Sequence, residues 1–107
     1  MTFFVKQNDT SPKLAATLKD ENGQIVHVTG ASVKFHMAKL SNSSVITDAS
    51  ATVTNGSAGK VEYAWSASDT ASIGTFRGEF EVTFPTGLVE TYPNSEYISI
   101  QITDDIT

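Results

Sequence analysis

The only histidines of this chain, His27 and His36, are the residues best suited to holding a metal ion. Two imidazoles with a carboxylate nearby can bind a metal such as zinc. The two histidines fall in separate predicted strands, however, and His36 shares the outward phase of Lys34, which favours a solvated strand face over a metal site. We therefore expect no metal ligands and no cofactor.

Nucleophilic catalysis has no candidate residue. The chain contains no cysteine, which excludes a thiolate nucleophile, a disulfide and a cysteine metal cage. No serine lies in a Gly-x-Ser-x-Gly elbow, and abundant serine and threonine are normal on the outer faces of β-sheets. The sequence therefore predicts no catalytic residues and no enzymatic activity.

Four carboxylates occur as adjacent pairs, Asp20 with Glu21 and Asp104 with Asp105. Calcium sites of β-sandwiches often lie in such turns and at chain ends, but neither pair has the spacing of an EF-hand loop. Turn formation and solubility explain both pairs better than a calcium site does.

Glu79 and Glu81 are two residues apart in a predicted strand, so they share one face, a geometry that glycosidases can use. The strand alternates strictly over residues 75–84, because successive side chains point to opposite sides. Its apolar face consists of Phe76, Gly78, Phe80, Val82 and Phe84, and its polar face of Arg77, Glu79, Glu81 and Thr83. The wet face of a strand explains the two glutamates better than a catalytic pair does.

The aromatic residues favour packing over sugar binding. Trp65 shares a strand face with Val61 and Tyr63, which predicts an indole packed between two sheets. Carbohydrate-binding modules instead place tryptophan and tyrosine on an exposed platform, and only Tyr92 and Tyr97 offer a candidate for one. Sugar stacking is the less favoured interpretation.

Phe3 and Phe4 are adjacent, so in a strand they cannot both point into one core. One of them needs another cover, which is either an edge of the same domain or a partner chain. We therefore take Phe3 and Phe4 as candidate partner-contact residues at an N-terminal strand edge, where unpaired backbone groups can accept another chain.

The pattern around these residues predicts seven to nine short strands, with turn signals at intervals of about ten residues. This spacing is typical of an all-β sandwich or small barrel, with neighbouring strands antiparallel, rather than of βαβ units. For the run 45–54, one bent strand and a hairpin arm fit equally well, and 66–73 reads as a crossover turn. The expected strands cover 3–6, 14–19, 24–28, 31–38, 45–54, 60–65, 75–84, 88–92 and 97–103.

Length and charge limit the partners. At 107 residues, the chain has room for a single domain spanning 1–107. Its formal net charge is −5, and its seven Lys and Arg residues are scattered singly, so nucleic acid and anionic membranes are poor partner candidates. No run approaches the length of a membrane-spanning helix, and residues 1–6 are too short for a signal peptide. We expect the protein to be made in the cytoplasm, and we expect no membrane insertion.

Six segments of the chain are informative through their order and spacing rather than through any one motif. The first-half segments are Phe-Val-Lys-Gln-Asn-Asp-Thr (4–10), Leu-Lys-Asp-Glu-Asn-Gly (18–23) and Val-Thr-Gly-Ala-Ser-Val-Lys-Phe-His-Met (28–37). The second-half segments are Ala-Gly-Lys-Val-Glu-Tyr-Ala-Trp (58–65), Asp-Thr-Ala-Ser-Ile-Gly-Thr-Phe-Arg-Gly-Glu-Phe-Glu-Val-Thr-Phe (69–84) and Val-Glu-Thr-Tyr-Pro-Asn (89–94). In this order and spacing the chain resembles the N-terminal domain of phage baseplate upper proteins, and the resemblance runs from Phe4 to Ile102.

The resemblance implies an all-β, immunoglobulin-like antiparallel β-sandwich of seven to nine strands. It further implies a non-enzymatic structural module of a tailed-phage virion, made in the host cytoplasm and binding other phage structural proteins. A homo-oligomer is compatible with it, and the family supplies no catalytic residues. Family members commonly continue beyond this domain, so baseplate, tail, neck or head component, or a fragment of a longer protein, all remain open. The alternative is a bacterial surface or carbohydrate-binding β-sandwich.

Overall fold

The computed structural model describes residues 2–94, 97–104 and 106. This part of the chain contains eight strands and no helix, and therefore no helix long and apolar enough to cross a membrane. The all-β class and the expected number of strands are confirmed. The strands are β1 (Thr2–Lys6), β2 (Leu14–Thr17), β3 (Ser32–Lys39), β4 (Val45–Asn55), β5 (Lys60–Tyr63), β6 (Gly74–Thr83), β7 (Val89–Tyr92) and β8 (Ile98–Thr103).

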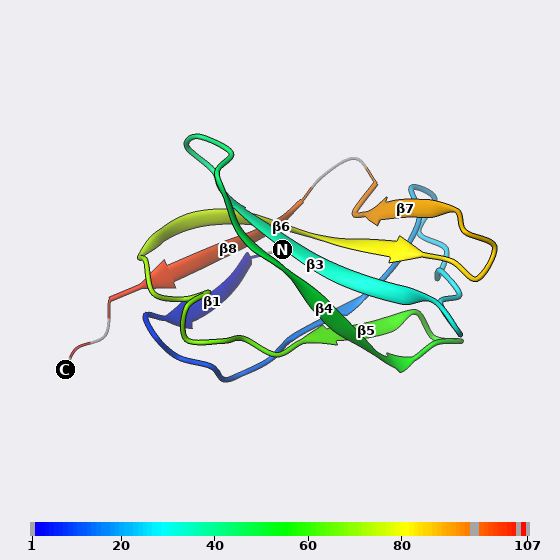
Figure 1. The fold of residues 1–107 in the computed structure, drawn as a ribbon, viewed down its shortest axis with the longest axis horizontal. Helices are drawn as coiled ribbons and strands as arrows, with labels where there is room; N and C mark the ends of the chain where they lie inside the picture. Colours follow the sequence, from blue (N-terminus) through cyan, green and yellow to red (C-terminus); the bar gives the residue numbers. More distant parts are fainter. Residues whose placement is uncertain (1, 95–96, 105, 107) are drawn as a thin grey trace.

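The strands form two layers that share β4 (Figure 1). Sheet A has the order β1-β8-β6-β3-β4, with β7 beside the second half of β6. Sheet B has the order β4-β5-β2. The first part of β4 pairs with β3, and its last residues pair with β5. The run 45–54 is therefore one strand that passes between sheets, which decides between the two alternatives that its sequence left open.

The prediction of a purely antiparallel sheet was wrong for the first strand. β1 pairs in parallel with β8, from Thr2 opposite Ser99 to Lys6 opposite Thr103. A parallel neighbour requires a long connection, and here almost the whole fold lies between the two strands. Alternation shows which face is buried but not which way a strand runs, so the sequence pattern could not reveal this pairing.

The prediction of a strand over 24–28 was also wrong. The chain turns back from β2 with a single bridge between Lys19 and Ile25. The N–H of Val28 then donates to the carbonyl oxygen of Gly56 at 2.9 Å, which draws the segment toward the β4–β5 turn. The segment therefore closes one end of the core as an irregular cover, and its Val28 is fully buried.

The predicted inward faces of β3, β6 and β8 are buried, and an aromatic cluster joins the two sheets. The ring of Phe35 lies 4.7 Å from that of Tyr63, 5.2 Å from that of Phe80 and 5.7 Å from the indole of Trp65, measured between centroids. Trp65 is only 4% exposed, which confirms its prediction as a packed indole. Burial of these large rings provides much of the driving force for folding.

Gly78 is the small residue that makes room for this cluster. A Cβ atom at this position would lie 2.7 Å from Cδ1 of Ile100 and 2.9 Å from ring atoms of Phe35. Because Gly78 has no side chain, the ring of Phe35 can pack directly against the backbone of β6 at this position.

We expect Gly78→Ala to lower the free energy of unfolding by about 1–3 kcal/mol, because the added methyl group overpacks the core. Urea denaturation followed by tryptophan fluorescence measures the change. Thr83→Val, at an exposed position of the same strand, is the control and should shift stability by less than about 0.5 kcal/mol. If Gly78→Ala is as stable as the parent chain, the neighbouring side chains can move to accommodate the added methyl group, and Gly78 is not required for packing.

Candidate functional site

The structure separates the two candidate contact residues, Phe3 and Phe4, to opposite faces of β1. Phe3 turns inward and stacks on Trp65 with ring centroids 5.8 Å apart. Phe4 turns outward, and 66% of it is exposed. Strand alternation requires this split. Of the two candidates, Phe4 is the side chain that is free to contact a partner.

The backbone of β1 also has a free side, because β1 is the end strand of sheet A. The N–H of Gln7 donates to the carbonyl oxygen of Thr103 at 2.8 Å, continuing the ladder with β8. In a parallel ladder, alternate residues bond to the neighbouring strand, so Phe3 and Val5 face β8. The backbone groups of Phe4 consequently point away from β8, toward the open edge.

A shallow hollow of about 170 Å³ lies beside this edge. Phe4 lines it together with Lys6, Asp9, Ser11 and Pro12. An exposed ring next to a hollow and an unpaired strand edge form a surface that another strand can cover. We call this surface, made by β1 and residues 9–12, the β1 edge.

The segment between β5 and β6 holds the β1 edge in place. The N–H of Asn8 donates to the carbonyl oxygen of Thr70 at 2.9 Å, and the Thr70 hydroxyl donates to the carbonyl oxygen of Asp9 at 2.9 Å. The side-chain amide of Gln7 donates to the carbonyl oxygen of Ala71 at 2.8 Å. Because Thr70 is fully buried, these contacts fasten the end of β1 to the core.

Asp69, next to Thr70, is a buried carboxylate with three donors. Its Oδ1 accepts from the hydroxyl of Thr47 at 2.8 Å. Its Oδ2 accepts from the hydroxyl of Tyr63 at 2.6 Å and from the N–H of Ser66 at 2.8 Å. Burial alone would raise the pKa of Asp69, but these hydrogen bonds outweigh it and hold the pKa below the usual 3.8. Burial of the Tyr63 hydroxyl, followed by its hydrogen bond to the carboxylate of Asp69 and the negative charge of that carboxylate, raises the pKa of Tyr63.

Sequence reasoning missed Asp69. It correctly identified 66–73 as a crossover turn, but it gave Asp69 no role in that turn. Asp69 is the only charged residue between 66 and 73, and it comes three positions after Ser66. An isolated carboxylate in a turn was the sequence signal that could have indicated its role. Its partners Thr47 and Tyr63 come from distant strands, and no local pattern links them.

We expect Asp69→Asn to lower the free energy of unfolding at pH 7 by about 2–3 kcal/mol, because the amide turns a donor toward groups that are themselves donors. Urea denaturation measures the loss. Glu21→Gln, which replaces an exposed carboxylate, should leave stability within about 0.5 kcal/mol of the parent chain.

The same variant should remove a pH dependence. The folded pKa of Asp69 is depressed, so its contribution is complete above the unfolded pKa of about 3.9 and is lost as pH falls through the folded pKa. The stability difference between parent and Asp69→Asn should be constant above about pH 5 and shrink below pH 4. A difference that persists unchanged to pH 2 would contradict a charged Asp69.

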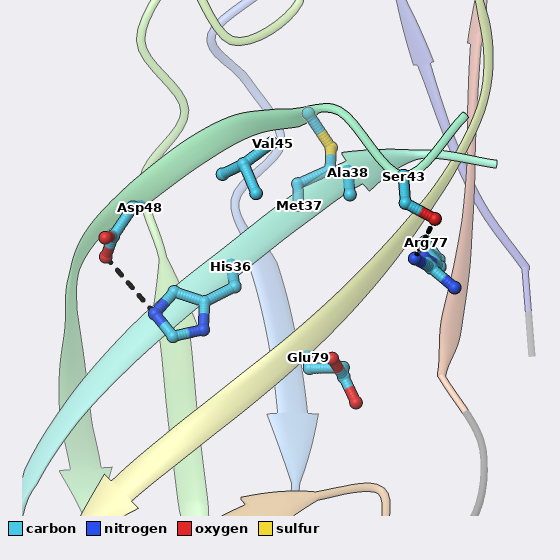
Figure 2. Close-up of a pocket in the computed structure, with 8 residues that line it drawn as sticks. All are labelled: His36, Met37, Ala38, Ser43, Val45, Asp48, Arg77 and Glu79. Atoms are coloured by element: carbon cyan, nitrogen blue, oxygen red, sulfur yellow. Dashed lines mark hydrogen bonds and ion pairs between the residues drawn. The ribbon is translucent and has the colours of Figure 1, made fainter. Parts of the chain in front are cut away.

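A polar groove of about 290 Å³ crosses the outer face of sheet A (Figure 2). His36 is directly opposite Asp48 on β4 and Glu79 on β6. Its Nε2 lies 3.2 Å from Oδ1 of Asp48, and Nζ of Lys34 lies 3.1 Å from the same oxygen. The hydrogen bond from Lys34 is the main cause that lowers the pKa of Asp48, and His36 contributes further.

The groove has the charges of a paired sheet face rather than a catalytic arrangement. Ser43 accepts a hydrogen bond from Arg77, so the structure does not pair this serine with His36 as a nucleophile would require. Glu79 lies opposite His36, and Glu81 lies opposite Lys34. The register thus places both glutamates on the same solvated strand face as Lys34 and His36. A wet strand face is a structural explanation for the two glutamates.

The remaining metal and turn candidates do not form a site. His27 is exposed in the segment between β2 and β3. Within the described ranges, no three His, Asp or Glu side chains are grouped so that they could hold a metal ion. Asp20 supports its own turn, accepting from the N–H groups of Asn22 and Gln24 at 2.9 and 3.0 Å. Asp105 lies outside the described residues.

The suggested aromatic platform contains only one exposed ring. Tyr92 is 3% exposed, and burial followed by the hydrogen bond with Glu90 raises its pKa to about 12. Tyr97 is 42% exposed and lines a cleft of about 320 Å³ with Pro93 and the strand β2. Tyr92 lines the same mostly apolar cleft but is buried, so these two tyrosines do not form the pair of exposed rings that the sugar-binding interpretation required.

No protein-family model matches the chain, and no curated protein sequence matches it either.

Proposed function

We propose that this protein is a non-enzymatic structural or assembly component of a tailed-phage virion, binding other phage structural proteins through the β1 edge. One observation carries the proposal: Phe4 is two-thirds exposed on an end strand whose backbone groups at that residue point outward. The likeness of the segment order to phage baseplate upper proteins indicates the class of partner. Baseplate, tail, neck and head sites are all consistent with such a contact.

We also propose that the two-layer arrangement is immunoglobulin-like. Two sheets with polar outer faces enclose an aromatic cluster, and a buried tryptophan, Trp65, packs between the layers. A sandwich of this kind exposes strand edges and loops at which another chain can bind. This architecture is compatible with a role in assembly and requires no cofactor.

The mode of binding that fits the β1 edge is strand addition. A partner strand alongside β1 would satisfy the outward N–H and C=O of Phe4, and the ring of Phe4 would be covered at the same time. Backbone pairing supplies affinity, and the ring with the hollow beside it supplies selectivity. The carbohydrate-binding alternative has only Tyr97 and its cleft in its favour.

We expect Phe4→Ser to weaken binding to a virion partner at least tenfold while the urea midpoint of the isolated chain stays the same, because the ring is exposed. The partners to test are tail and capsid proteins encoded beside this gene, by co-purification and calorimetry. Tyr97→Ser removes an exposed ring of another surface and is the matched control.

The proposal fails if neighbouring genes encode no virion proteins, or if Phe4→Ser binds a virion partner as tightly as the parent chain. Binding to a glycan array that is lost in Tyr97→Ser and kept in Phe4→Ser would favour the carbohydrate alternative.

The backbone contribution can be tested separately with Lys6→Pro. The N–H of Lys6 belongs to the outward set, so proline removes a donor that only a partner strand would use, and edge strands tolerate proline there. We expect weaker partner binding in Lys6→Pro but not in Lys6→Ala, which keeps the N–H. Equal binding by both variants would exclude strand addition at this position.

A further inference from the structure

An apolar tip stands at one end of the molecule, in the turn that joins β6 to β7. Leu88 is 71% exposed and Val89 is 57% exposed. The turn is ordered by hydrogen bonds, with the N–H of Phe84 donating to the carbonyl oxygen of Leu88 at 2.8 Å. Because neighbouring side chains of an extended segment point to opposite sides, these two present uncovered aliphatic surface on both sides of this end of the molecule. We call Leu88 and Val89 the tip.

An apolar hollow lies at the other end of the same strand. It measures about 380 Å³ and lies between the β3–β4 loop and the start of β6. Leu40 and Ile73, which line it, are 44% and 50% exposed. The N–H of Leu40 donates to the carbonyl oxygen of Thr75 at 3.2 Å, so the loop is tethered to the strand. We call this depression the hollow.

The tip cannot reach the hollow of its own chain. The ten residues of β6 separate them, which is about 33 Å of extended strand, and the longest dimension of the molecule is 45 Å. Figure 1 shows the β6–β7 turn and the start of β6 at opposite ends of the ribbon. Contact between tip and hollow therefore requires two copies in head-to-tail order.

The charges beside the two features are opposite. Glu90 follows the tip directly and is exposed. Lys39 lines the hollow. A chain with a net charge of −5 repels copies of itself in most orientations, and this orientation brings an acidic end to a basic residue. Charge complementarity thus favours the head-to-tail contact over other ways of covering the tip.

We propose that copies of this protein associate head to tail, with Leu88 and Val89 of one copy seated in the hollow of the next and Glu90 facing Lys39. The contact joins two different surfaces, so every added copy leaves one tip and one hollow free, and growth continues until a ring closes or a fibre forms. Phe4 lies across β8 from Thr75 in the strand register, about 10 Å from it, and is not part of the contact.

Two complementary variants test the proposal. The tip variant is Leu88→Ser with Val89→Ser, and the hollow variant is Leu40→Ser with Ile73→Ser. Sedimentation velocity on the purified parent chain, up to about 1 mM, should show concentration-dependent growth. Each variant alone should remain monomeric, whereas an equimolar mixture should form a 1:1 dimer, because one intact tip meets one intact hollow.

A charge exchange tests the orientation. Lys39→Glu and Glu90→Lys should each weaken association several-fold, and the chain with both changes should recover most of it. Lys13→Glu, a charge reversal elsewhere on the surface, is the control, and Phe4→Ser should associate normally. Urea midpoints equal to that of the parent chain exclude misfolding as the cause of any loss.

A parent chain that stays monomeric throughout, a mixture of tip and hollow variants that stays monomeric, or a single variant that still dimerises would each overturn the proposal. Because these measurements use the purified chain alone, their failure leaves the binding of virion partners at the β1 edge untouched. Loss of association in Phe4→Ser would instead show that self-association uses the β1 edge.

Discussion

The segment that connects sheet B to sheet A depends on the buried carboxylate of Asp69. Its two oxygens accept hydrogen bonds from Thr47 of β4, Tyr63 of β5 and the backbone of Ser66. A buried charge is tolerated only when it is well hydrogen-bonded, so these partners must all be in place at once. Asp69 thereby fixes the segment that leaves sheet B and returns to sheet A.

That segment in turn positions the first strand. The carbonyl oxygen of Thr70 accepts a hydrogen bond from the N–H of Asn8, and the hydroxyl of Thr70 donates one to the carbonyl oxygen of Asp9. Both partners lie just beyond β1. β1 therefore lies beside β8 in parallel, with Phe3 against Trp65 and Phe4 in solvent. The position of Phe4 therefore depends on two successive sets of contacts. Asp69 binds Thr47 and Tyr63, and the adjacent Thr70 holds the end of β1.

Polar residues of the outer face are largely committed to one another. Asp48 is shared by Lys34 and His36, and the register places Glu79 and Glu81 opposite cationic or titratable partners of β3. The two contacts of Asp48 join β3 to β4 on this solvated face. At the β1 edge and at the two ends of β6, by contrast, the exposed side chains of Phe4, Leu88 and Ile73 are apolar.

The sequence by itself determined where most strands lie and which side chains of β3, β6 and β8 are buried, because alternation is a local property with a period of two residues. It also predicted that Trp65 packs inside and that Phe3 and Phe4 cannot share one face. It wrongly predicted a strand at 24–28 and an antiparallel first strand, since pairing partners and strand direction are set by residues far apart in the chain.

Only the tertiary structure decided that Phe4 and not Phe3 is exposed, that β4 passes between the sheets, and that Asp69 is the acceptor joining three segments. Each of these depends on which strand occupies an edge and which distant donors meet in the core. Close packing of the aromatic cluster selects one such arrangement among many with the same alternation, and the free energy of that packing is a property of the whole fold.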